Sequence, residues 1–574
     1  MSQLEKYIRP YWGYIILTTI IKLAGTITDL AIPYLMKMVL DIEKISGKGE
    51  IYLYGGLMAF AALLTVCLNL YANRMAAISS GKITRALRHD LFSKLERLSA
   101  RQMDKLTTSS AVSRLTSDTY NVNNMLTRFQ RMGIRAPIML VGGIFMMLTM
   151  DWVLALVLVA MLPIISIVVY LVTKKSVPMH VYQQSVLDNV VRTVQENITG
   201  VRVIKALSKT EYEKNRFEGV NEELSQAGLR AGMVTSISNP VTTLTLNLGL
   251  TVVVLIGAFR VSSDATEGTV IVAFLQYFTQ ILMAMLGITR IFVMCSNGIA
   301  SANRVADVLT LPEDMEVMPE ERQEAEENPA HIEFKNVSFS YTGVGKNISN
   351  LSFRLERGQT LGILGPTGSG KSTIINLLLR MYDADEGQVL IGGKDIRSIE
   401  HEALRKMFGT VFQNDFIAEG TIADNIRFFR DLTDEQLAQG ARDAQAEPFI
   451  AEKEGGMNAE VVVRGNNLSG GQKQRLLISR ALAADPDILI LDDSSSALDY
   501  RTDSELRKAL RKNYRDTTTV LIAQRVSSLR HADLILVLDD GEVIGAGSHA
   551  QLMETCEEYR TIANIQMGEG KEGA

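Results

Sequence analysis

Six apolar stretches dominate the first 290 residues, and each approaches the length of about 20 residues that a helix needs to cross a bilayer. Polar and charged segments separate these stretches, so the pattern repeats on the scale of a membrane span rather than of a surface helix. We therefore predict six transmembrane helices, near residues 14–36, 51–72, 134–150, 152–173, 240–260 and 268–290.

The connections between these stretches alternate in length. Those after the first, third and fifth stretches are short, whereas those after the second and fourth, residues 73–133 and 174–239, are long. The first long connection is rich in Arg and Lys, so the positive-inside tendency places it and the N-terminus in the cytoplasm. The N-terminal MSQLEKYIRPYW is polar and the apolar stretch after it is too long for a signal h-region, so we expect no cleavable signal peptide.

Both long connections keep apolar residues at helical spacing. One interpretation is that separate soluble helices form in the loops, and the other is that the membrane helices continue into the cytoplasm. We favour continuation because no Gly or Pro punctuation separates the connections from the spans.

The composition changes abruptly after residue 310. Residues 311–330 are acidic, contain prolines and lack an apolar face, which indicates a linker. From His331 onward, apolar runs of strand type alternate with helical segments, a pattern typical of an α/β domain. The predicted organisation is an α-helical transmembrane domain of six spans with long cytoplasmic extensions (1–310), a linker (311–330) and an α/β P-loop domain (331–574).

Composition and charge agree with this division. The 574 residues are 47% hydrophobic and 21% charged, which is typical of a membrane part joined to a soluble part. A net charge of -5 without a long basic run gives no indication of a nucleic-acid partner. The scattered Cys67, Cys295 and Cys556 lack metal-ligand spacing, so we expect buried small hydrophobic residues rather than disulfides or a zinc site.

The soluble part contains a phosphate-binding motif. The strand-type run at 360–364 leads into GPTGSGKST and then into a helical segment, which is the context that a P-loop requires. Backbone N–H groups at a helix N-terminus bind phosphates, Lys371 reaches the β and γ oxygens, and Ser372 is placed for Mg²⁺. The residues predicted to bind the nucleotide here are Gly365, Gly368, Gly370, Lys371, Ser372 and Thr373.

A second motif narrows the choice among P-loop families. LSGGQKQR, residues 468–475, precedes ILILDD, residues 488–493. The first resembles the signature sequence of ATP-binding cassette (ABC) proteins, and the second resembles their Walker B strand. With six spans in front, nearly the whole chain is similar to an ABC exporter half-transporter. The resemblance implies ATP and Mg²⁺ as ligands, ATP hydrolysis coupled to transport, and signature contacts to ATP from Ser469, Gly470, Gly471 and Gln472.

The resemblance also assigns roles to single residues. Tyr341 matches the aromatic residue that stacks on adenine, and Gln413 matches the Q-loop glutamine that senses Mg²⁺. Asp492 matches the Walker B carboxylate that holds Mg²⁺ together with Ser372. Ser496-Ala497-Leu498-Asp499 fits the D-loop, which crosses to the partner subunit and brings Asp499 to the nucleotide site.

Two positions depart from the family pattern. The family usually has a glutamate as general base directly after the Walker B aspartate, and this chain has Asp493, which is one methylene shorter. A base must come within hydrogen-bond reach of the water that it orients. At the switch position the family has a histidine, and this chain has Gln524, which can donate a hydrogen bond but cannot carry a proton's charge. Both changes predict that this chain's own Walker site binds ATP but hydrolyses it poorly. His531, seven residues later, is interpreted as a surface residue.

This asymmetry implies a second chain. In the family, each ATP lies between the Walker motifs of one subunit and the signature of the other. A homodimer of this chain would contain two poor bases, whereas a heterodimer with a half-transporter that has Glu and His would use this chain's signature at a working site. The segments near Met103–Ser109 and Lys209–Lys214 resemble the family's coupling helices, which connect such a site to the membrane.

The cargo is the least constrained part of the prediction. The methionines of the third and sixth spans either line a cavity for hydrophobic compounds or only pack, and packing is the better supported. They are Met139, Met146, Met147 and Met150 in the third span and Met283 and Met285 in the sixth, which also has Gln276 and Gln280 one helical turn apart.

Lys22 and Asp29 lie on one face of the first span. Pairing with each other, pairing with another helix and exposure to an aqueous cavity all stay open.

The leading hypothesis is ATP-driven export of hydrophobic or amphipathic compounds, drug-like or lipid-like, from a bacterial cytoplasmic membrane. The partners are a second half-transporter, the lipid bilayer and a hydrophobic small molecule. Two alternatives are kept: a lipid or peptide exporter, and a regulatory subunit whose ATP binding gates a partner without pumping.

Overall fold

The computed structural model describes residues 2–41, 48–312, 315–319, 330–413, 416–494 and 497–567. They form two compact units. The first combines residues 1–96 with 109–311, and the second combines residues 97–108 with 312–574. The short segment 97–108 therefore packs with the α/β part, although the sequence division at 310 assigns it to the transmembrane part.

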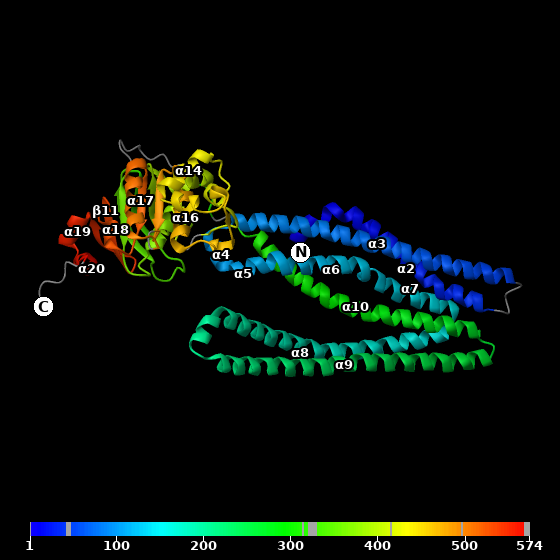
Figure 1. Ribbon diagram of the computed structural model, residues 1–574. Coiled ribbons are helices and arrows are strands. Elements are labelled where there is room, and N and C mark those ends of the chain that lie inside the picture. The colour runs from blue at the N-terminus through cyan, green and yellow to red at the C-terminus, as the bar shows by residue number, and fades with distance from the viewer. Residues whose placement is uncertain are drawn as a thin grey trace. The chain divides into compact units, whose positions relative to one another are not determined.

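The first unit is built from helices, four of them very long (Figure 1). Their bounds are α1 Ser2–Ile8, α2 Trp12–Leu40, α3 Lys48–Arg97, α5 Thr108–Ser113, α6 Thr119–Arg128, α7 Arg135–Met150, α8 Trp152–Ala206, α9 Thr210–Ser262 and α10 Gly268–Leu309. A short 3-10 helix, Arg9–Tyr11, precedes α2, and two π-helical turns, Arg114–Asp118 and Phe129–Gly133, flank α6.

The prediction that the membrane helices continue beyond their spans is confirmed. Helices α3, α8 and α9 contain 50, 55 and 53 residues without a break, which corresponds to roughly 75–83 Å each. Among the described residues, five helices are long and apolar enough to cross a membrane. The fourth predicted span lies in α8, whose described apolar stretch, Trp152–Ile164, is shorter.

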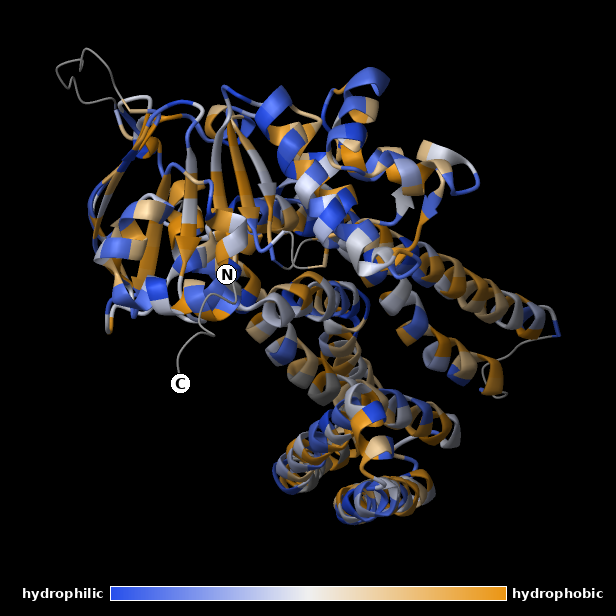
Figure 2. Ribbon diagram, turned by 60° about the vertical axis from the view of Figure 1, so that its left-hand side comes forward, coloured by the Kyte–Doolittle hydropathy of each residue, from blue (hydrophilic) through white to orange (hydrophobic). Residues whose placement is uncertain are grey.

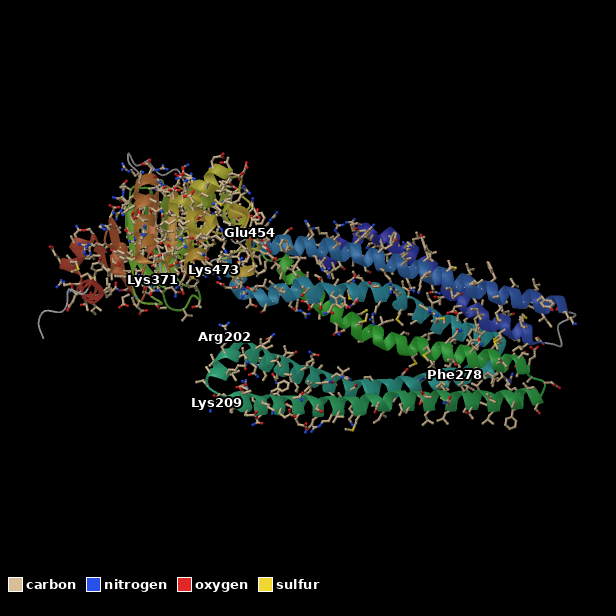
Figure 3. All side chains as sticks on the ribbon, in the orientation of Figure 1. Arg202, Lys209, Phe278, Lys371, Glu454 and Lys473 are labelled. Carbon is tan, nitrogen blue, oxygen red and sulfur yellow. The ribbon has the colours of Figure 1, made fainter. Side chains whose placement is uncertain are left out.

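Helices α8 and α9 run side by side as an antiparallel hairpin (Figure 1). Arg202 and Lys209 lie near its turn (Figure 3), and α9 begins at Thr210 directly after this turn. The predicted coupling segment Lys209–Lys214 thus forms the end of the hairpin and the first turn of α9.

Aromatic residues of α10 form the core of the first unit. Phe274, Tyr277 and Phe278 are fully buried, and the Tyr277 hydroxyl donates to the carbonyl of Leu30 in α2 at 2.6 Å. Gly249 of α9 allows close approach, because a Cβ there would lie 2.4 Å from Cζ of Phe278. Figure 3 marks Phe278 on α10.

The methionines of the third and sixth spans divide between core and surface. Met139 and Met147 are buried in the same cluster as the α10 aromatics, whereas Met283 is exposed. The packing interpretation holds for the two buried residues. The three cysteines are free, and Cys67 is exposed, so the expectation of burial is wrong for this residue. Cys67 lies within the predicted second span, where a small apolar side chain does not need burial by protein because a bilayer core is itself apolar.

The second unit contains two main sheets. The antiparallel sheet has the order β2-β1-β4-β5, and the six-stranded sheet has the order β12-β11-β3-β10-β9-β6, parallel except for β12. The strands are β1 Ile332–Phe339, β2 Ile348–Leu355, β3 Thr360–Leu364, β4 Glu386–Ile391, β5 Lys394–Asp395, β6 Phe408–Val411, β7 Gly420–Thr421, β8 Glu460–Val461, β9 Ile488–Asp492, β10 Thr518–Ile522, β11 Leu534–Asp539 and β12 Glu542–Gly547.

Helices cover these sheets, and hydrophobic residues are concentrated along the strands (Figure 2). The helices of the second unit are α4 Ala100–Leu106, α11 Lys371–Leu378, α12 His401–Lys406, α13 Ile422–Arg427, α14 Asp434–Asp443, α15 Glu447–Ala451, α16 Gly470–Leu482, α17 Tyr500–Asn513, α18 Val526–Leu529, α19 His549–Thr555 and α20 Glu557–Met567.

The central strands β3, β10 and β9 determine where the polar loops meet. All five residues of β9 are buried, as expected for a strand covered on both faces. In the parallel register, Ile522 of β10 lies opposite Ile363 of β3 and Asp492 of β9. The carboxyl ends of three strands therefore meet at one edge of the sheet, the usual place for a ligand site in an open α/β fold.

Asp151 joins two of the long helices of the first unit. It caps α8 by accepting from the N–H groups of Val153 at 2.9 Å and Leu154 at 3.2 Å. Its other oxygen accepts from Nε of Arg260 in α9, also at 2.9 Å. The Asp151 side chain is only 2% exposed.

We expect Asp151→Ala to lower the free energy of unfolding by about 3 kcal/mol, because it removes a helix cap and leaves a partly buried guanidinium without its carboxylate. Asp151→Asn keeps a cap acceptor and should lose less. Thermal unfolding of the purified chain in detergent measures both variants, and equal losses would contradict a separate contribution from the helix cap.

Candidate ATP site

The P-loop lies between β3 and α11, as the sequence predicts. Gly368 and Gly370 adopt φ values of +91° and +97°, which favour glycine. A Cβ on Gly370 would also lie 2.6 Å from Cδ1 of Ile348. Lys371 donates to the carbonyls of Gly365 at 2.9 Å and Pro366 at 2.6 Å, so its ammonium group is held over the loop whose N–H groups bind phosphates in this motif.

Ser372 and Asp492 lie together beside this loop. The Ser372 hydroxyl donates to a carboxylate oxygen of Asp492 at 3.4 Å, and Asp492 is buried. Burial raises the pKa of Asp492, and it lowers the pKa of the Lys371 ammonium. A hydroxyl and a carboxylate at the P-loop are oxygen ligands of the kind that Mg²⁺ prefers, so these residues fit the predicted ion.

Gln413 follows β6 and is exposed. Its two following neighbours, residues 414 and 415, lie outside the described residues, so its assignment to the Q-loop stays a prediction.

The two residues that depart from the family pattern contact each other. Gln524 Nε2 donates to Oδ2 of Asp493 at 3.0 Å. Asp493 has a φ of +48°, and its N–H donates to the carbonyl of Ile522 at 3.0 Å. Burial raises the pKa of Asp493, while Arg525, Gln524 and Lys371 act in the opposite direction. The Asp493 carboxylate therefore already accepts a hydrogen bond from the switch position.

The C-terminal helix α20 holds the switch residue. Gln566 Nε2 donates to the carbonyl of Gln524 at 2.9 Å, and Gln566 Oε1 accepts from the N–H of Val526 at 2.7 Å. This single side chain therefore fixes the backbone on both sides of residue 525. Gln566 was not predicted from the sequence, because a glutamine in a terminal helix belongs to no motif.

The signature begins helix α16. Ser469 caps this helix by accepting from the N–H of Gln472, whose side chain returns the contact to Ser469 in a capping box. In the part of the chain that the structure describes, no hydrogen bond joins Ser469, Gly470, Gly471 or Gln472 to this chain's own P-loop.

A second residue missed by the sequence analysis connects the signature helix to Walker B. Gln474 Nε2 donates to the carbonyl of Asp493 at 3.3 Å, and Gln474 Oε1 accepts from the N–H of Ala497 at 2.9 Å. Ser496 of the predicted D-loop lies outside the described residues. Asp499 caps α17 by accepting from the N–H of Thr502 at 2.9 Å. The D-loop is thus bound at one end by the signature helix and at the other by its own cap.

Tyr341 lies beside the P-loop helix. Its hydroxyl donates to Oγ1 of Thr373 at 3.4 Å and accepts from Nδ2 of Asn376 at 3.0 Å. Its ring meets Phe339 and Tyr382 edge to face, with centroids 4.9 and 5.0 Å apart. The structure brings Tyr341 to α11, and stacking on adenine stays a prediction.

Helix α4 forms the part of the second unit that comes from residues 97–108. Ser99 caps it by accepting from the N–H of Gln102, and Gln102 Nε2 donates to the carbonyl of Pro312 at 2.7 Å. The Tyr382 hydroxyl donates to Asp104 at 2.5 Å. Burial, followed by this hydrogen bond, raises the pKa of Tyr382. The first predicted coupling segment, Met103–Ser109, overlaps this anchored helix.

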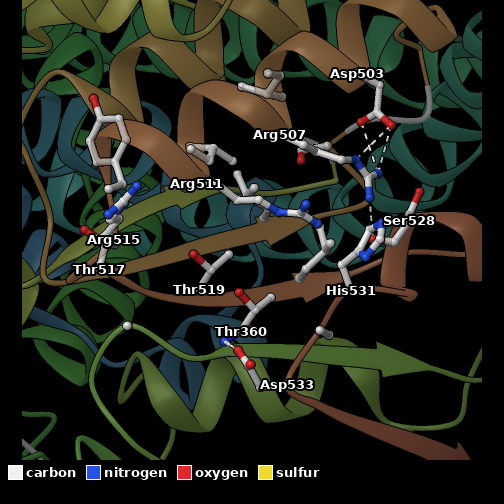
Figure 4. A pocket seen from close by; sticks show the side chains of 18 residues that line it. Thr360, Asp503, Arg507, Arg511, Arg515, Thr517, Thr519, Ser528, His531 and Asp533 are labelled. Atoms are coloured by element: carbon white, nitrogen blue, oxygen red, sulfur yellow. Dashed lines mark hydrogen bonds and ion pairs between the residues drawn. The ribbon is translucent and has the colours of Figure 1, made fainter. Parts of the chain in front are cut away.

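A separate cavity of about 330 Å³ lies between α17 and strands β3 and β10 (Figure 4). Arg507 in its wall pairs with Asp503, and the exposed His531 also lines it. Burial and the neighbouring Arg511 lower the pKa of His531. No P-loop residue is among the described residues that line this cavity, so His531 lies outside the ATP site, as predicted for a surface residue.

Comparison with known proteins matches both parts of the chain. Residues 15–285 match the ABC transporter transmembrane region, and residues 348–496 match the ABC transporter family. An uncharacterized ABC transporter ATP-binding protein of Mycobacterium tuberculosis is 30% identical over 572 residues, covering 99% of this chain and 98% of that protein. Another from Bacillus subtilis is 31% identical over 579 residues, covering 100% of both chains.

Two further matches concern cargo and fold. A fatty acid ABC transporter ATP-binding/permease protein of Mycobacterium bovis is 32% identical over 498 residues, covering 86% of this chain and 78% of that protein. The structure of a bacterial Atm1-family ABC exporter with ATP bound superimposes with a TM-score of 0.81 at 24% identity, covering 98% of this chain and 99% of the other.

The predicted family, fold class and location are therefore confirmed. An α-helical membrane region is fused to an α/β domain that contains P-loop, signature and Walker B, and relatives of the same organisation match along the full length. This chain belongs to the ABC transporters: it is a multi-pass half-transporter with the Atm1-family exporter fold, whose cytoplasmic domain binds ATP with Mg²⁺ and couples its hydrolysis to transport.

Proposed function

We propose that this chain is the degenerate-site half of a heterodimeric exporter of hydrophobic or amphipathic compounds. The observation that carries the proposal is the hydrogen bond from Gln524 to Asp493, together with an intact signature that is fully capped by Ser469. The partner is a second half-transporter with glutamate and histidine at the two corresponding positions.

The geometry argues against efficient hydrolysis at this chain's own Walker site. A general base has to reach the attacking water with a free carboxylate oxygen. Asp493 is one methylene shorter than the usual glutamate, and Oδ2 already accepts from Gln524. Gln524 is neutral, so it contributes no positive charge toward the γ-phosphate. Ser372 and Asp492 would hold Mg²⁺, which would neutralise charge on the phosphates. The changes at Asp493 and Gln524 leave these two residues in place.

The same chain keeps what a partner's site needs. Ser469 and the N–H groups at the start of α16 form an anion-binding helix terminus. Gln474 connects that helix to the backbone of Asp493 and Ala497. A movement of the signature helix at the partner's ATP site is therefore transmitted to the Walker B end of this chain's own ATP site. Atm1-like exporters are often homodimers, and a homodimer is the alternative that the experiments must exclude.

The membrane unit supports an apolar cargo. Its helices α2, α3 and α7 expose large hydrophobic side chains, which suit a lipid-like compound as well as the bilayer, and one relative is named for fatty acid transport. We include lipid-like compounds among the proposed substrates on this basis.

The first prediction restores the two altered positions together. We expect Asp493→Glu combined with Gln524→His to raise ATP hydrolysis by the chain alone in lipid by roughly tenfold or more, because a longer base and a charged switch residue become available. Phosphate release measures the rate. Adding Lys371→Ala to the same protein is the control and should abolish the gain. Robust hydrolysis by the unaltered chain alone would contradict the proposal and favour a homodimer.

The second prediction separates this chain's Walker site from its signature within the heterodimer. Asp493→Asn should change ATP turnover less than about twofold, since the base used for turnover belongs to the partner. Ser469→Arg should reduce turnover by roughly a hundredfold, because it removes donors from the partner's working site. An equally large loss with Asp493→Asn would contradict the proposed division of roles.

A further inference from the structure

A lysine is buried in the first membrane helix. Lys22 of α2 is 3% exposed, and its ammonium group donates to Oδ1 of Asn73 in α3 at 3.1 Å. A charged side chain within a span costs several kcal/mol and in most proteins serves a function. One amide oxygen does not neutralise this charge.

Two arginines of the third span region add to the positive charge. Arg131 donates to the carbonyl of Asn73 at 3.0 Å, and Arg135 donates to Asp29 of α2 at 2.6 Å. The charged side chains that act on Lys22 are Arg135, Arg131 and Asp29. Among the described residues, three cations therefore share one carboxylate. We call Lys22, Arg131 and Arg135 the cationic cluster.

Three other cations of the same unit are balanced one to one. Arg304 pairs with Asp118, Arg260 pairs with Asp151, and Lys37 pairs with Glu267. The cationic cluster differs from these pairs, because its described side chains leave an excess of two positive charges.

Unpaired polar atoms lie on the same helices. Within the described ranges, the Nε of Arg131 is buried without a hydrogen-bond partner, as are Oγ1 of Thr65 and Oδ1 of Asn69 on α3. Thr65, Asn69 and Asn73 follow at four-residue spacing on one face of α3. That face meets α2, because a Cβ on Gly25 would lie 3.3 Å from Nδ2 of Asn69. A polar seam therefore runs from Thr65 to the cationic cluster.

The cluster is open on one side. The Arg135 side chain is 42% exposed, while its partner Asp29 is only 16% exposed. Met132, one helical turn before Arg135, is 48% exposed. A guanidinium donates more hydrogen bonds than one carboxylate oxygen accepts, so Arg135 retains donors for a second anion. Methionine adapts to apolar groups of varied shape.

We propose that the cationic cluster binds the anionic head group, carboxylate or phosphate, of an amphipathic cargo, with the apolar tail against the neighbouring helix surface. This inference rests on the proposed export function and names its substrate class. Arg135 contacts the head group, and the buried Lys22 and the half-buried Arg131 supply a fixed positive potential behind it. Low dielectric in the bilayer strengthens that attraction relative to water.

The test compares one tail with three head groups. A fluorescent dodecyl chain that ends in a carboxylate, a methyl ester or a trimethylammonium group is titrated, without ATP, onto the full transporter with its partner in phosphatidylcholine nanodiscs. We expect the carboxylate to bind at least tenfold more tightly than the ester. Lys22→Gln and Arg135→Gln should each remove most of this preference. ATP-dependent transport of the same three probes is then measured in vesicles.

Control variants separate charge from folding. Lys82→Gln removes one exposed cation from the same helix as Asn73 and should leave the preference unchanged. Arg135→Lys keeps the charge and should retain most of the binding. Competition by phosphatidylglycerol in the nanodisc would identify a bilayer lipid as the natural source of the head group, whereas its absence would point to a soluble amphiphile.

Binding and transport test the two proposals separately. Carboxylate-selective binding that depends on Lys22 and Arg135 supports the inference even if no probe is transported, and in that case the export proposal fails. Equal affinity for the three head groups, or equal losses for all three in the Gln variants, overturns the inference while export of a neutral probe would leave the proposed function intact.

Discussion

The hydrogen bond between Gln524 and Asp493 joins the ends of two neighbouring parallel strands, and the proposed division of roles between two chains depends on it. The register that sets Ile522 opposite Asp492 makes this contact possible. Gln566 holds the switch side, and Gln474 holds the Walker B side and continues to the D-loop. The bond therefore belongs to a connected set of amide contacts that extends from the C-terminal helix to the signature helix.

Two kinds of asymmetry follow from this chain. In the nucleotide-binding domain, a short carboxylate and a neutral amide replace a base and a histidine, while the signature is complete. In the described part of the membrane unit, three cations share one carboxylate. Under the two proposals, each site is completed from outside this chain: the first by a catalytic partner chain, and the second by an anion. Binding energy from both can bias the transporter between its states only where affinity differs between those states.

Local patterns in the sequence predicted most of the fold. The length of the apolar stretches located the spans. A strand followed by a glycine-rich loop and a helix located Lys371, and a second apolar strand that ends in two carboxylates located Asp492. Contacts between distant segments were not predictable in this way. Gln566 acts on Gln524 across 42 residues, and segment 97–108 packs with the second unit. For Lys22 and Asp29, the sequence left three possibilities open; the structure pairs each with another helix, through Asn73 and Arg135.

The most direct test of the proposed asymmetry is nucleotide trapping resolved by chain. The heterodimer turns over a photoreactive ATP analogue, is trapped with vanadate and crosslinked, and the ADP and ATP bound to each chain's Walker site are quantified. The proposed asymmetry predicts trapped ADP on the partner and retained ATP on this chain. Equal amounts of trapped ADP on both chains would contradict it.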